Sequence, residues 1–146
     1  MAATPFVFTQ LSDDDRECLA ALGAVALVAL ERGGCDMSAI SGTKADLPIL
    51  QHSFETGRFD LSDPDELDGL SVLFGDVLAY ELGLRWVMAS GPYGTSPVLR
   101  YQQTSIQLAV LQMIRRRVEE GPKVDLMALF TGLAALVEEM IASGQY

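Results

Sequence analysis

The chain has 146 residues, enough for one domain with a single hydrophobic core, and its 49% hydrophobic and 21% charged residues exclude a disordered chain. Twenty acidic and ten basic residues give a net charge of −10. Such a field repels nucleic-acid phosphate and anionic lipid and attracts basic proteins, so we predict no nucleic-acid partner and no membrane partner.

The negative charge belongs to the first half of the sequence. Residues 1–83 carry fifteen acids and four bases, whereas residues 84–146 carry five acids and six bases. This asymmetry favours a partner-facing acidic surface as much as it favours simple solubility. The two readings stay open at this point.

Nothing in the sequence indicates a secreted, membrane-bound or metal-binding protein. The two cysteines, Cys18 and Cys35, match no metal or redox spacing, and Cys18 is expected to be a buried small hydrophobe. The N-terminus lacks the pattern of a signal peptide. The apolar run from Leu19 to Leu30 is too short to span a bilayer. We therefore expect a cytoplasmic protein without cofactor or metal.

The first predicted helix begins at Ser12, a favourable N-cap followed by three aspartates that suit the positive end of the helix dipole. Asp15 stands where a capping box prefers Glu or Gln, so we expect an imperfect box. Nearly every position from Cys18 to Leu30 is apolar, which predicts a central helix buried on most of its sides. Gly33-Gly34 end it.

A loop and two helices are predicted next. Residues 34–46 are small and polar and indicate a loop, and a short helix is expected from Asp46 to Glu55. Asp63 as the cap and Pro64 at the first helical position begin a long helix that ends at Gly83.

The long helix has a helical spacing of apolar residues, interrupted by two glycines. Gly69 and Gly75 lower its helix propensity, and we expect them to permit close packing against a neighbouring element. The apolar positions at this spacing are Leu67, Leu70, Leu73, Phe74, Val77 and Leu78.

The pattern then changes to that of a β-hairpin. Residues 84–89 form a short run that contains β-branched and aromatic side chains, and residues 98–101 resume an extended pattern. Gly91-Pro92-Tyr93-Gly94 between them has the composition of a turn. Tyr93 is expected at the exposed tip, where aromatic side chains commonly anchor protein interfaces.

The last third is predicted to be mainly helical. Ser105 can cap a helix over residues 106–119, or residues 104–109 can begin as a third strand, because apolar and polar residues alternate there. Asp125 caps the last helix. An apolar stripe follows along it: Leu126, Leu129, Phe130, Leu133, Leu136, Val137, Met140 and Ile141.

Together these elements predict an α+β fold in which helices pack on a small antiparallel hairpin or a three-stranded sheet. The sequence contains no internal repeat, linker or low-complexity tract. We therefore expect residues 1–146 to form a single domain.

Part of the chain resembles a known family. The stretch Leu73-Phe74-Gly75-Asp76-Val77-Leu78, then residues 81–87 with their tryptophan, then Tyr93-Gly94, and finally residues 113–121 with their basic-acidic helix end resemble a family of small bacterial proteins catalogued as a domain of unknown function. The resemblance covers residues 60–122. Some small acidic bacterial proteins of this general type are immunity proteins of secreted toxins, which is the function that the resemblance suggests, and it transfers no functional residue.

The densest cluster of charge lies at the start of the long helix. Acids are favoured in a first turn, so the cluster has a structural explanation as a helix start. Pro64 and that helical start break the alternating spacing that a calcium loop requires, so we predict no metal site. If the acids are exposed, they can form the contact surface for a basic partner. The candidate contact residues are Asp60, Asp63, Asp65, Glu66 and Asp68, with Tyr93 nearby.

No local pattern indicates catalysis, and we predict a protein that is not an enzyme. His52 is the single histidine, and there is neither a nucleophile elbow nor a phosphate-binding loop around which a site could form. Asp76 and Glu81 lie in or at the end of an apolar helix and are explained as paired structural acids. The three arginines Arg115–Arg117 point in three directions from their helix, so they cannot form one patch. A nucleic-acid site needs a larger basic surface.

The leading hypothesis is therefore an acidic cytoplasmic protein-binding module, in its most specific form an immunity protein that occludes a basic toxin domain. One alternative is a secretion chaperone, which would show an exposed apolar groove and a two-fold dimer. The other is an enzyme whose site is assembled from distant residues, using Asp76, Glu81 and His52, which would show a deep pocket around them.

Overall fold

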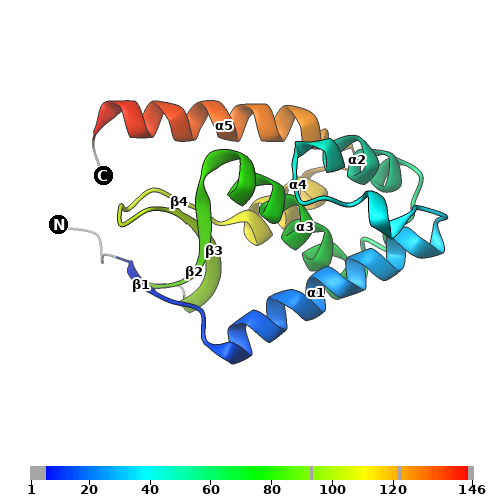
Figure 1. Cartoon of the computed structure of the whole chain (residues 1–146), viewed down its shortest axis with the longest axis horizontal. Coiled ribbons are helices and arrows are strands. Elements are labelled where there is room, and N and C mark those ends of the chain that lie inside the picture. The colour runs from blue at the N-terminus through cyan, green and yellow to red at the C-terminus, as the bar shows by residue number, and fades with distance from the viewer. Residues whose placement is uncertain (1–5, 93, 122, 145–146) are drawn as a thin grey trace.

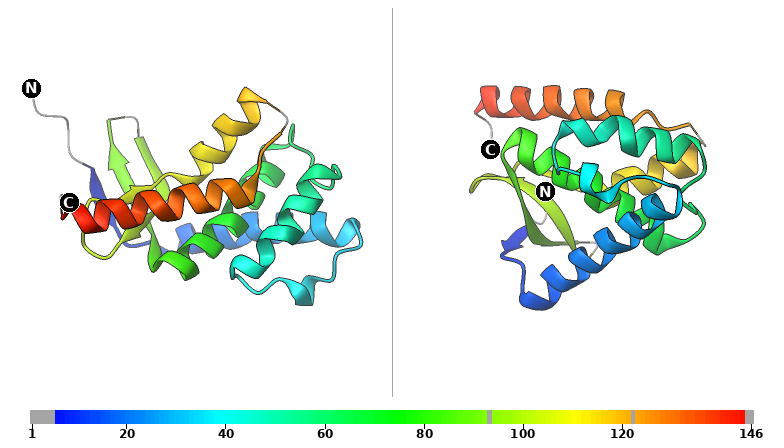
Figure 2. Two further views of the ribbon diagram at one scale, coloured as in Figure 1. Left: turned by 90° about the horizontal axis from the view of Figure 1, so that it is seen from above. Right: turned by 45° about the vertical axis from the view of Figure 1, so that its right-hand side comes forward.

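The computed structural model describes residues 6–92, 94–121 and 123–144, which contain five α-helices and four β-strands. The architecture is α+β, as the sequence predicts. Figure 1 shows the sheet at one end of the molecule, α1 (Asp13–Arg32) along one edge and α5 (Leu126–Ser143) along the opposite edge. Figure 2 shows the same arrangement from two further sides.

The strands form one antiparallel sheet in the order β1-β2-β3-β4. The predicted hairpin is confirmed and is longer than expected, with β2 at Leu84–Gly91 and β3 at Gly94–Tyr101. The third strand is confirmed only as the two-residue β4, Gln107–Leu108. The edge strand β1, Val7–Thr9, was not predicted, because three residues are too few for an alternating pattern.

Three more helices complete the fold: α2 (Leu47–Glu55), α3 (Pro64–Leu82) and α4 (Val110–Glu120). Short 3₁₀ turns at Met37–Ala39 and Lys44–Asp46 interrupt the loop that leads into α2. The predicted helices are all found within about two residues of their expected bounds, except that α4 begins after β4 and without a side-chain cap.

The central helix is α3, which corrects the prediction that the first helix is central. Twelve of the 19 residues of α3 are buried, whereas α1 buries only five of its 20, because α1 contacts the core with one face. The outer face of α1 is open, and Cys18, which was expected to be buried, is exposed there.

The two glycines of α3 are explained by close packing, as predicted. A Cβ atom at Gly69 would collide with the carbonyl oxygen of Leu22 and lie 3.0 Å from the Cβ of Ala26, both on α1. A Cβ atom at Gly75 would overlap the indole ring of Trp86 on β2. Each glycine therefore lets a neighbour lie directly against the α3 backbone.

Helix caps follow the sequence, with one correction. The capping box of α1 is complete, because Ser12 Oγ accepts from the backbone N–H of Asp15 at 3.0 Å while Asp15 Oδ2 accepts from that of Ser12 at 2.9 Å. The shorter aspartate thus takes the role that Glu or Gln usually fills. Asp63 caps α3 and Asp125 caps α5, both as predicted.

Candidate functional site

Five carboxylates gather where α1 ends and α3 begins, and we call them the acidic end: Glu31, Asp36, Asp60, Asp63 and Asp65. The two segments are held together by contacts between them. Arg32 Nη2 lies 2.7 Å from Glu66 Oε1, and Arg58 Nη1 donates to the carbonyl oxygen of Gly33. None of the five carboxylates forms an ion pair within the described part of the chain.

Two of the predicted contact residues are buried and lie inside the protein's own framework. Glu66 is only 6% exposed and pairs with Arg32, and Asp68 is only 7% exposed and pairs with Arg115 of α4 at 2.5 and 2.8 Å. The expectation that all five acids of the cluster share one exposed surface is therefore wrong for these two. They lie on the inner face of the first two turns of α3, where the neighbouring helices supply arginines.

The other predicted contact residues are placed differently. Asp60 and Asp65 are exposed and Asp63 is half-exposed while it caps α3. Tyr93 lies outside the described residues. Gly91 and Gly94 pair at the closed end of the β2–β3 hairpin, away from the beginning of α3 (Figure 1), so these two residues do not adjoin the acidic end.

Local hydrogen bonds keep two members of the acidic end ionised. The hydroxyl and backbone N–H of Ser62 donate to Asp60 Oδ1 and lower the pKa of that carboxyl. Ser38 lowers the pKa of Asp36 in the same way. Beside these acids lies a shallow hollow of about 440 Å³, lined by Gly33, Gly34, Cys35, Pro48, Ile49, His52, Ser53 and Arg58.

Asp76 is held by a tryptophan and not by a base. Trp86 Nε1 donates to Asp76 Oδ1 at 3.0 Å, and the ring of Trp86 lies against Gly75. Desolvation by burial raises the pKa of Asp76, an effect that the hydrogen bond from Trp86 partly opposes. The Gly-Asp step on α3 and the tryptophan on β2 therefore act as one packing unit: the glycine makes room for the ring and the aspartate accepts its N–H.

Asp76 lies apart from His52 and Glu81, the two residues with which it would form the active site in the alternative enzyme hypothesis. His52 is exposed beside Cys35, and Glu81 accepts the backbone N–H of Lys44 at 3.2 Å. Asp76 borders a shallow apolar groove between α1 and α3. The three side chains thus lie in three separate surroundings. Within residues 6–92, 94–121 and 123–144 no group of three or more His, Cys, Asp or Glu side chains is placed to hold a metal ion.

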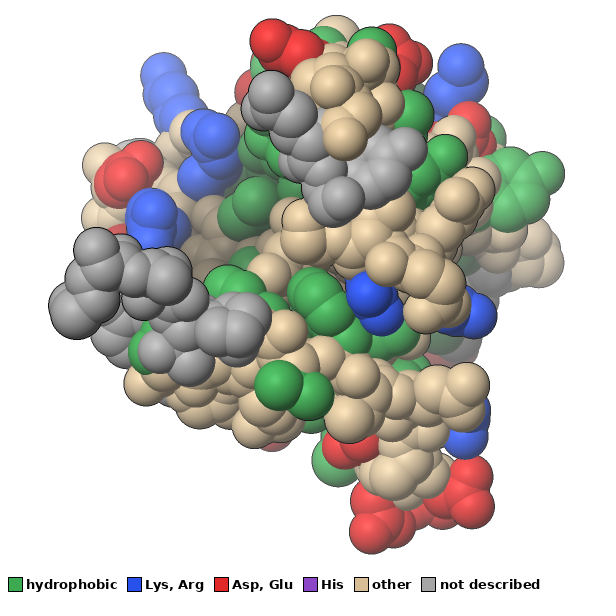
Figure 3. Space-filling model, turned by 90° about the vertical axis from the view of Figure 1, so that its left-hand side faces the viewer, with side chains coloured by type: hydrophobic (Ala, Val, Ile, Leu, Met, Phe, Trp, Pro, Cys, Tyr) green, Lys and Arg blue, Asp and Glu red, His purple; other side chains and the backbone are tan. Residues whose placement is uncertain are grey.

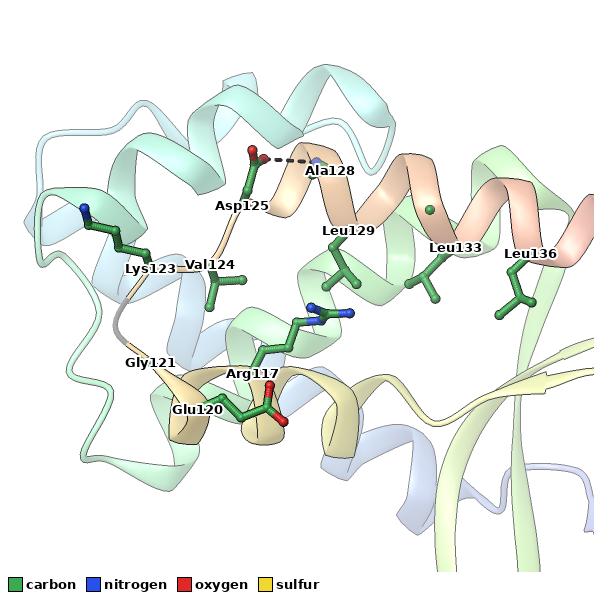
Figure 4. Close-up of a pocket in the computed structure, with 11 residues that line it drawn as sticks. Arg117, Glu120, Gly121, Lys123, Val124, Asp125, Ala128, Leu129, Leu133 and Leu136 are labelled. Atoms are coloured by element: carbon green, nitrogen blue, oxygen red, sulfur yellow. Dashed lines mark hydrogen bonds between the residues drawn. The ribbon is translucent and has the colours of Figure 1, made fainter.

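A second surface, which we call the α4–α5 groove, is apolar along one side. It has a volume of about 750 Å³. Figure 4 shows Arg117 reaching from α4 toward Leu129 and Leu133 of α5. Figure 3 shows the hollow beneath the end of α5, with hydrophobic side chains on its wall and basic side chains at its rim. The lining residues on α5 are Ala128, Leu129, Gly132, Leu133 and Leu136, and Glu120, Lys123 and the N-cap Asp125 line the end of the groove near the start of α5.

Sequence reasoning missed this groove. It assigned Leu136 to the buried stripe, yet Leu136 is 44% exposed. The signal available in the sequence was the spacing of Ala128, Gly132 and Leu136, four residues apart on one helix face beside the buried stripe. That spacing indicates a second apolar face, although it does not indicate whether the chain itself covers it.

Comparisons with known proteins bear on the family and on the fold. The family model described as "Domain of unknown function (DUF3806)" matches residues 46–130. No curated protein matches the chain. A crystal structure from Bacteroides thetaiotaomicron VPI-5482 is similar in fold, with a TM-score of 0.75 at 15% sequence identity over 90% of this chain. The chain spans 48% of the length of that protein.

Proposed function

We propose that this chain, which belongs to the DUF3806 family of domains of unknown function, is a protein-binding module whose acidic end docks on a basic surface of a partner. The observation that carries the proposal is the set of five carboxylates at one end of the molecule, none of them paired with a base in the described part of the chain. Arg32 and Arg58 lie at the same end and reduce this negative charge without cancelling it. An excess of one sign of charge on a surface steers association with a surface of the opposite sign.

The neighbouring hollow supports the same reading. Pro48 and Ile49 offer apolar surface there, and Cys35, the chain neighbour of Asp36, lines the same hollow. A partner can place an apolar anchor in this hollow while its basic residues meet the acidic end. Anchors of this kind mainly set the dissociation rate, and the charges mainly set the association rate.

The first prediction tests the acidic end directly. The variant Asp60→Asn, Asp63→Asn, Asp65→Asn removes three negative charges while Asn still caps α3. As bait in a pull-down from the source lysate, read by quantitative mass spectrometry, it should lose partners that the wild-type chain captures. With a captured partner, the association rate should fall about tenfold or more and its salt dependence should flatten.

A matched control exists at the other end of α1. The variant Asp13→Asn, Asp14→Asn, Asp15→Asn changes the net charge by the same amount at a different place. It should capture the same partners as the wild type. Equal capture by all three baits, or an equal loss in both variants, would refute a docking role for the acidic end.

A finer form of the proposal is an immunity protein that occludes a basic toxin domain. What favours it is the combination of a −10 net charge with an acidic end beside a hollow. The test is genetic: the product of the adjacent reading frame is expressed with and without this chain. The proposal is supported if cells that express the neighbouring product alone die and cells that also express the wild-type chain grow. Co-expression of the triple Asn variant of the acidic end should not restore growth. A harmless neighbour would remove this finer form and leave the binding module untouched.

A further inference from the structure

Two hollows meet at Trp86, where α1, α3 and β2 come together. One has a volume of about 490 Å³ and the other a volume of about 400 Å³. Leu11, Arg16 and Trp86 line both of them, so the two hollows are arms of one cleft, which we call the Trp86 cleft. Volumes of this size are typical of sites for small ligands.

The larger arm carries positive charge. Among the described residues its lining has two charged side chains, Arg16 and Arg85, and no acid, although the chain has twice as many acids as bases. The exposed side chain of Arg85 forms no hydrogen bond or ion pair with any described residue. Arg16 lies 3.2 Å from Asp13, but this ion pair is exposed to water and is therefore weak. Both guanidinium groups can thus accept a further anion.

The sheet adds to this positive charge. Arg85 lies directly opposite Arg100 in the β2–β3 register, and like charges at opposed positions repel each other. The side chain of Arg100 has partners within the chain, because its Nε donates to the carbonyl oxygen of Thr104 at 2.6 Å and its guanidinium lies 4.1 Å from the ring centre of Phe8. An anion bound beside Arg85 would relieve the repulsion between the two arginines.

The smaller arm runs between α1 and α3 and is mainly apolar. From α1 it receives Ala20 and Ala24, which are exposed, and Leu27, which is half-buried. Asp76 is the one acid that the described part of the chain contributes to either arm. Its Oδ1 accepts the indole N–H of Trp86 at 3.0 Å, and this bond holds the ring in place as a wall that both arms share.

We propose that the Trp86 cleft binds a small amphiphilic carboxylate, with its carboxylate at Arg16 and Arg85 and its apolar body along the arm between α1 and α3. The planar N–H groups of arginine match the two oxygens of a carboxylate. The apolar arm removes hydrocarbon from water, which a free inorganic anion could not use. The basic arm favours a negative head over a positive one. The proposal does not rest on the acidic end.

The single tryptophan of the chain makes a direct test possible, because its fluorescence reports on the cleft. Titration of the full chain with decanoate, below the concentration at which decanoate forms micelles, should change the fluorescence of Trp86 saturably, with one site per chain by calorimetry. Decyltrimethylammonium has a similar body and a positive head, and acetate has the head without the body. Each should bind about tenfold more weakly than decanoate or not at all.

One set of variants tests the basic arm. Arg85→Gln should weaken decanoate binding about tenfold, because it removes a charge-assisted hydrogen bond. Arg117→Gln is the matched control, since it removes the same charge from an exposed arginine of α4 outside the cleft, and it should leave the affinity unchanged. Asp13→Asn releases Arg16 and should tighten binding about twofold, more than Asp14→Asn does one residue along the chain.

A further pair tests the apolar arm. Ala20→Glu places a charge in the lining and should abolish decanoate binding. Ala21→Glu is the matched control, because Ala21 is also exposed on α1 but does not line the cleft, and it should bind decanoate as the wild type does. Circular dichroism should show the same folded state for both variants, since neither side chain is buried.

Four outcomes would overturn the proposal. The first is that decanoate leaves the fluorescence of Trp86 unchanged. The second is that decyltrimethylammonium or decanol binds as tightly as decanoate, which would remove the arginines from recognition. The third is an equal loss of affinity in Arg85→Gln and Arg117→Gln, which would make net charge the cause. The fourth is an equal loss in Ala20→Glu and Ala21→Glu, which would place the apolar body elsewhere.

Discussion

The helices α3 and α5 are both rich in apolar residues, but the fold buries most of α3 and little of α5. In α3 twelve of 19 residues are buried, whereas in α5 only the four residues of one face are. Four elements, α1, α4, α5 and β2, contact α3, whereas the main contacts of α5 are with α2 and α3. The difference teaches that an apolar helix is explained by the fold only where the fold supplies partners, and that the remainder needs an explanation from outside the chain.

The charged residues of the two helices differ in the same way. Glu66 and Asp68 of α3 are buried and each meets an arginine from another helix. Glu138 and Glu139 of α5 are exposed and form no ion pair within the described residues. A buried carboxylate needs a compensating partner, and here the partners are the half-exposed arginines Arg32 of α1 and Arg115 of α4, which cover the two carboxylates from outside the core.

The largest expected effect comes from adding one methyl group to each helix. Gly69→Ala should lower the free energy of unfolding by about 3 kcal/mol, because the new Cβ meets the backbone of α1, although alanine favours a helix. Gly132→Ala should raise it by about 0.5–1 kcal/mol, since nothing lies within 4 Å of its Cβ position. Urea denaturation of both variants measures the two changes in the free energy of unfolding. Equal effects would contradict the contrast between the helices.

Next in size is the removal of an arginine. Arg115→Ala should destabilise the protein by about 2–3 kcal/mol, because it leaves the Asp68 carboxylate buried without its partner. Arg117→Ala, two residues along the same helix, should change the free energy of unfolding by less than about 0.5 kcal/mol, because Arg117 is exposed and unpaired among the described residues. Thermal unfolding of the two variants measures both effects. A similar loss of stability in both would show that the ion pair between Arg115 and Asp68 contributes no more than any exposed arginine.

The smallest expected effect concerns the pH dependence of stability. Burial raises the pKa of Asp76 above its ordinary value of 3.8, so the folded state favours the protonated carboxyl. Ionisation therefore costs stability as pH rises from that value through the raised pKa, and the cost remains at pH 7. Asp76→Asn, which still accepts from Trp86, should be as stable as the wild type near pH 3 and slightly more stable at pH 7, measured by urea denaturation at the two pH values.

Glu138→Gln on α5 is the control for that measurement, because Glu138 is exposed. It removes one negative charge from the surface, so a gain at pH 7 seen equally in both variants would be an effect of net charge and not of Asp76. A wild-type advantage over Asp76→Asn at pH 7 would show that the carboxylate of Asp76 is stabilised by something other than Trp86.

The elements themselves were largely predictable because their signals are local. Each of these signals acts within a few positions of the chain. They are the caps at Ser12, Asp63 and Asp125, the apolar period of α3, and the turn residues between β2 and β3. The candidate site was predictable only in part. Asp60 and Asp65 lie on the surface, as their polarity indicates. Nothing near Glu66 or Asp68 in the sequence predicts their burial, because the arginines that pair with them come from other helices.

By itself the sequence determined where the helices and the hairpin lie, the sign and the uneven distribution of the charge, and the need of Gly69 and Gly75 for close neighbours. Only the tertiary structure decided that α3 and not α1 is the centre, that two acids of the cluster are internal, and that α5 keeps an open apolar face. The physical reason is that propensity and capping depend on adjacent residues, whereas burial depends on which distant elements happen to pack against a given face.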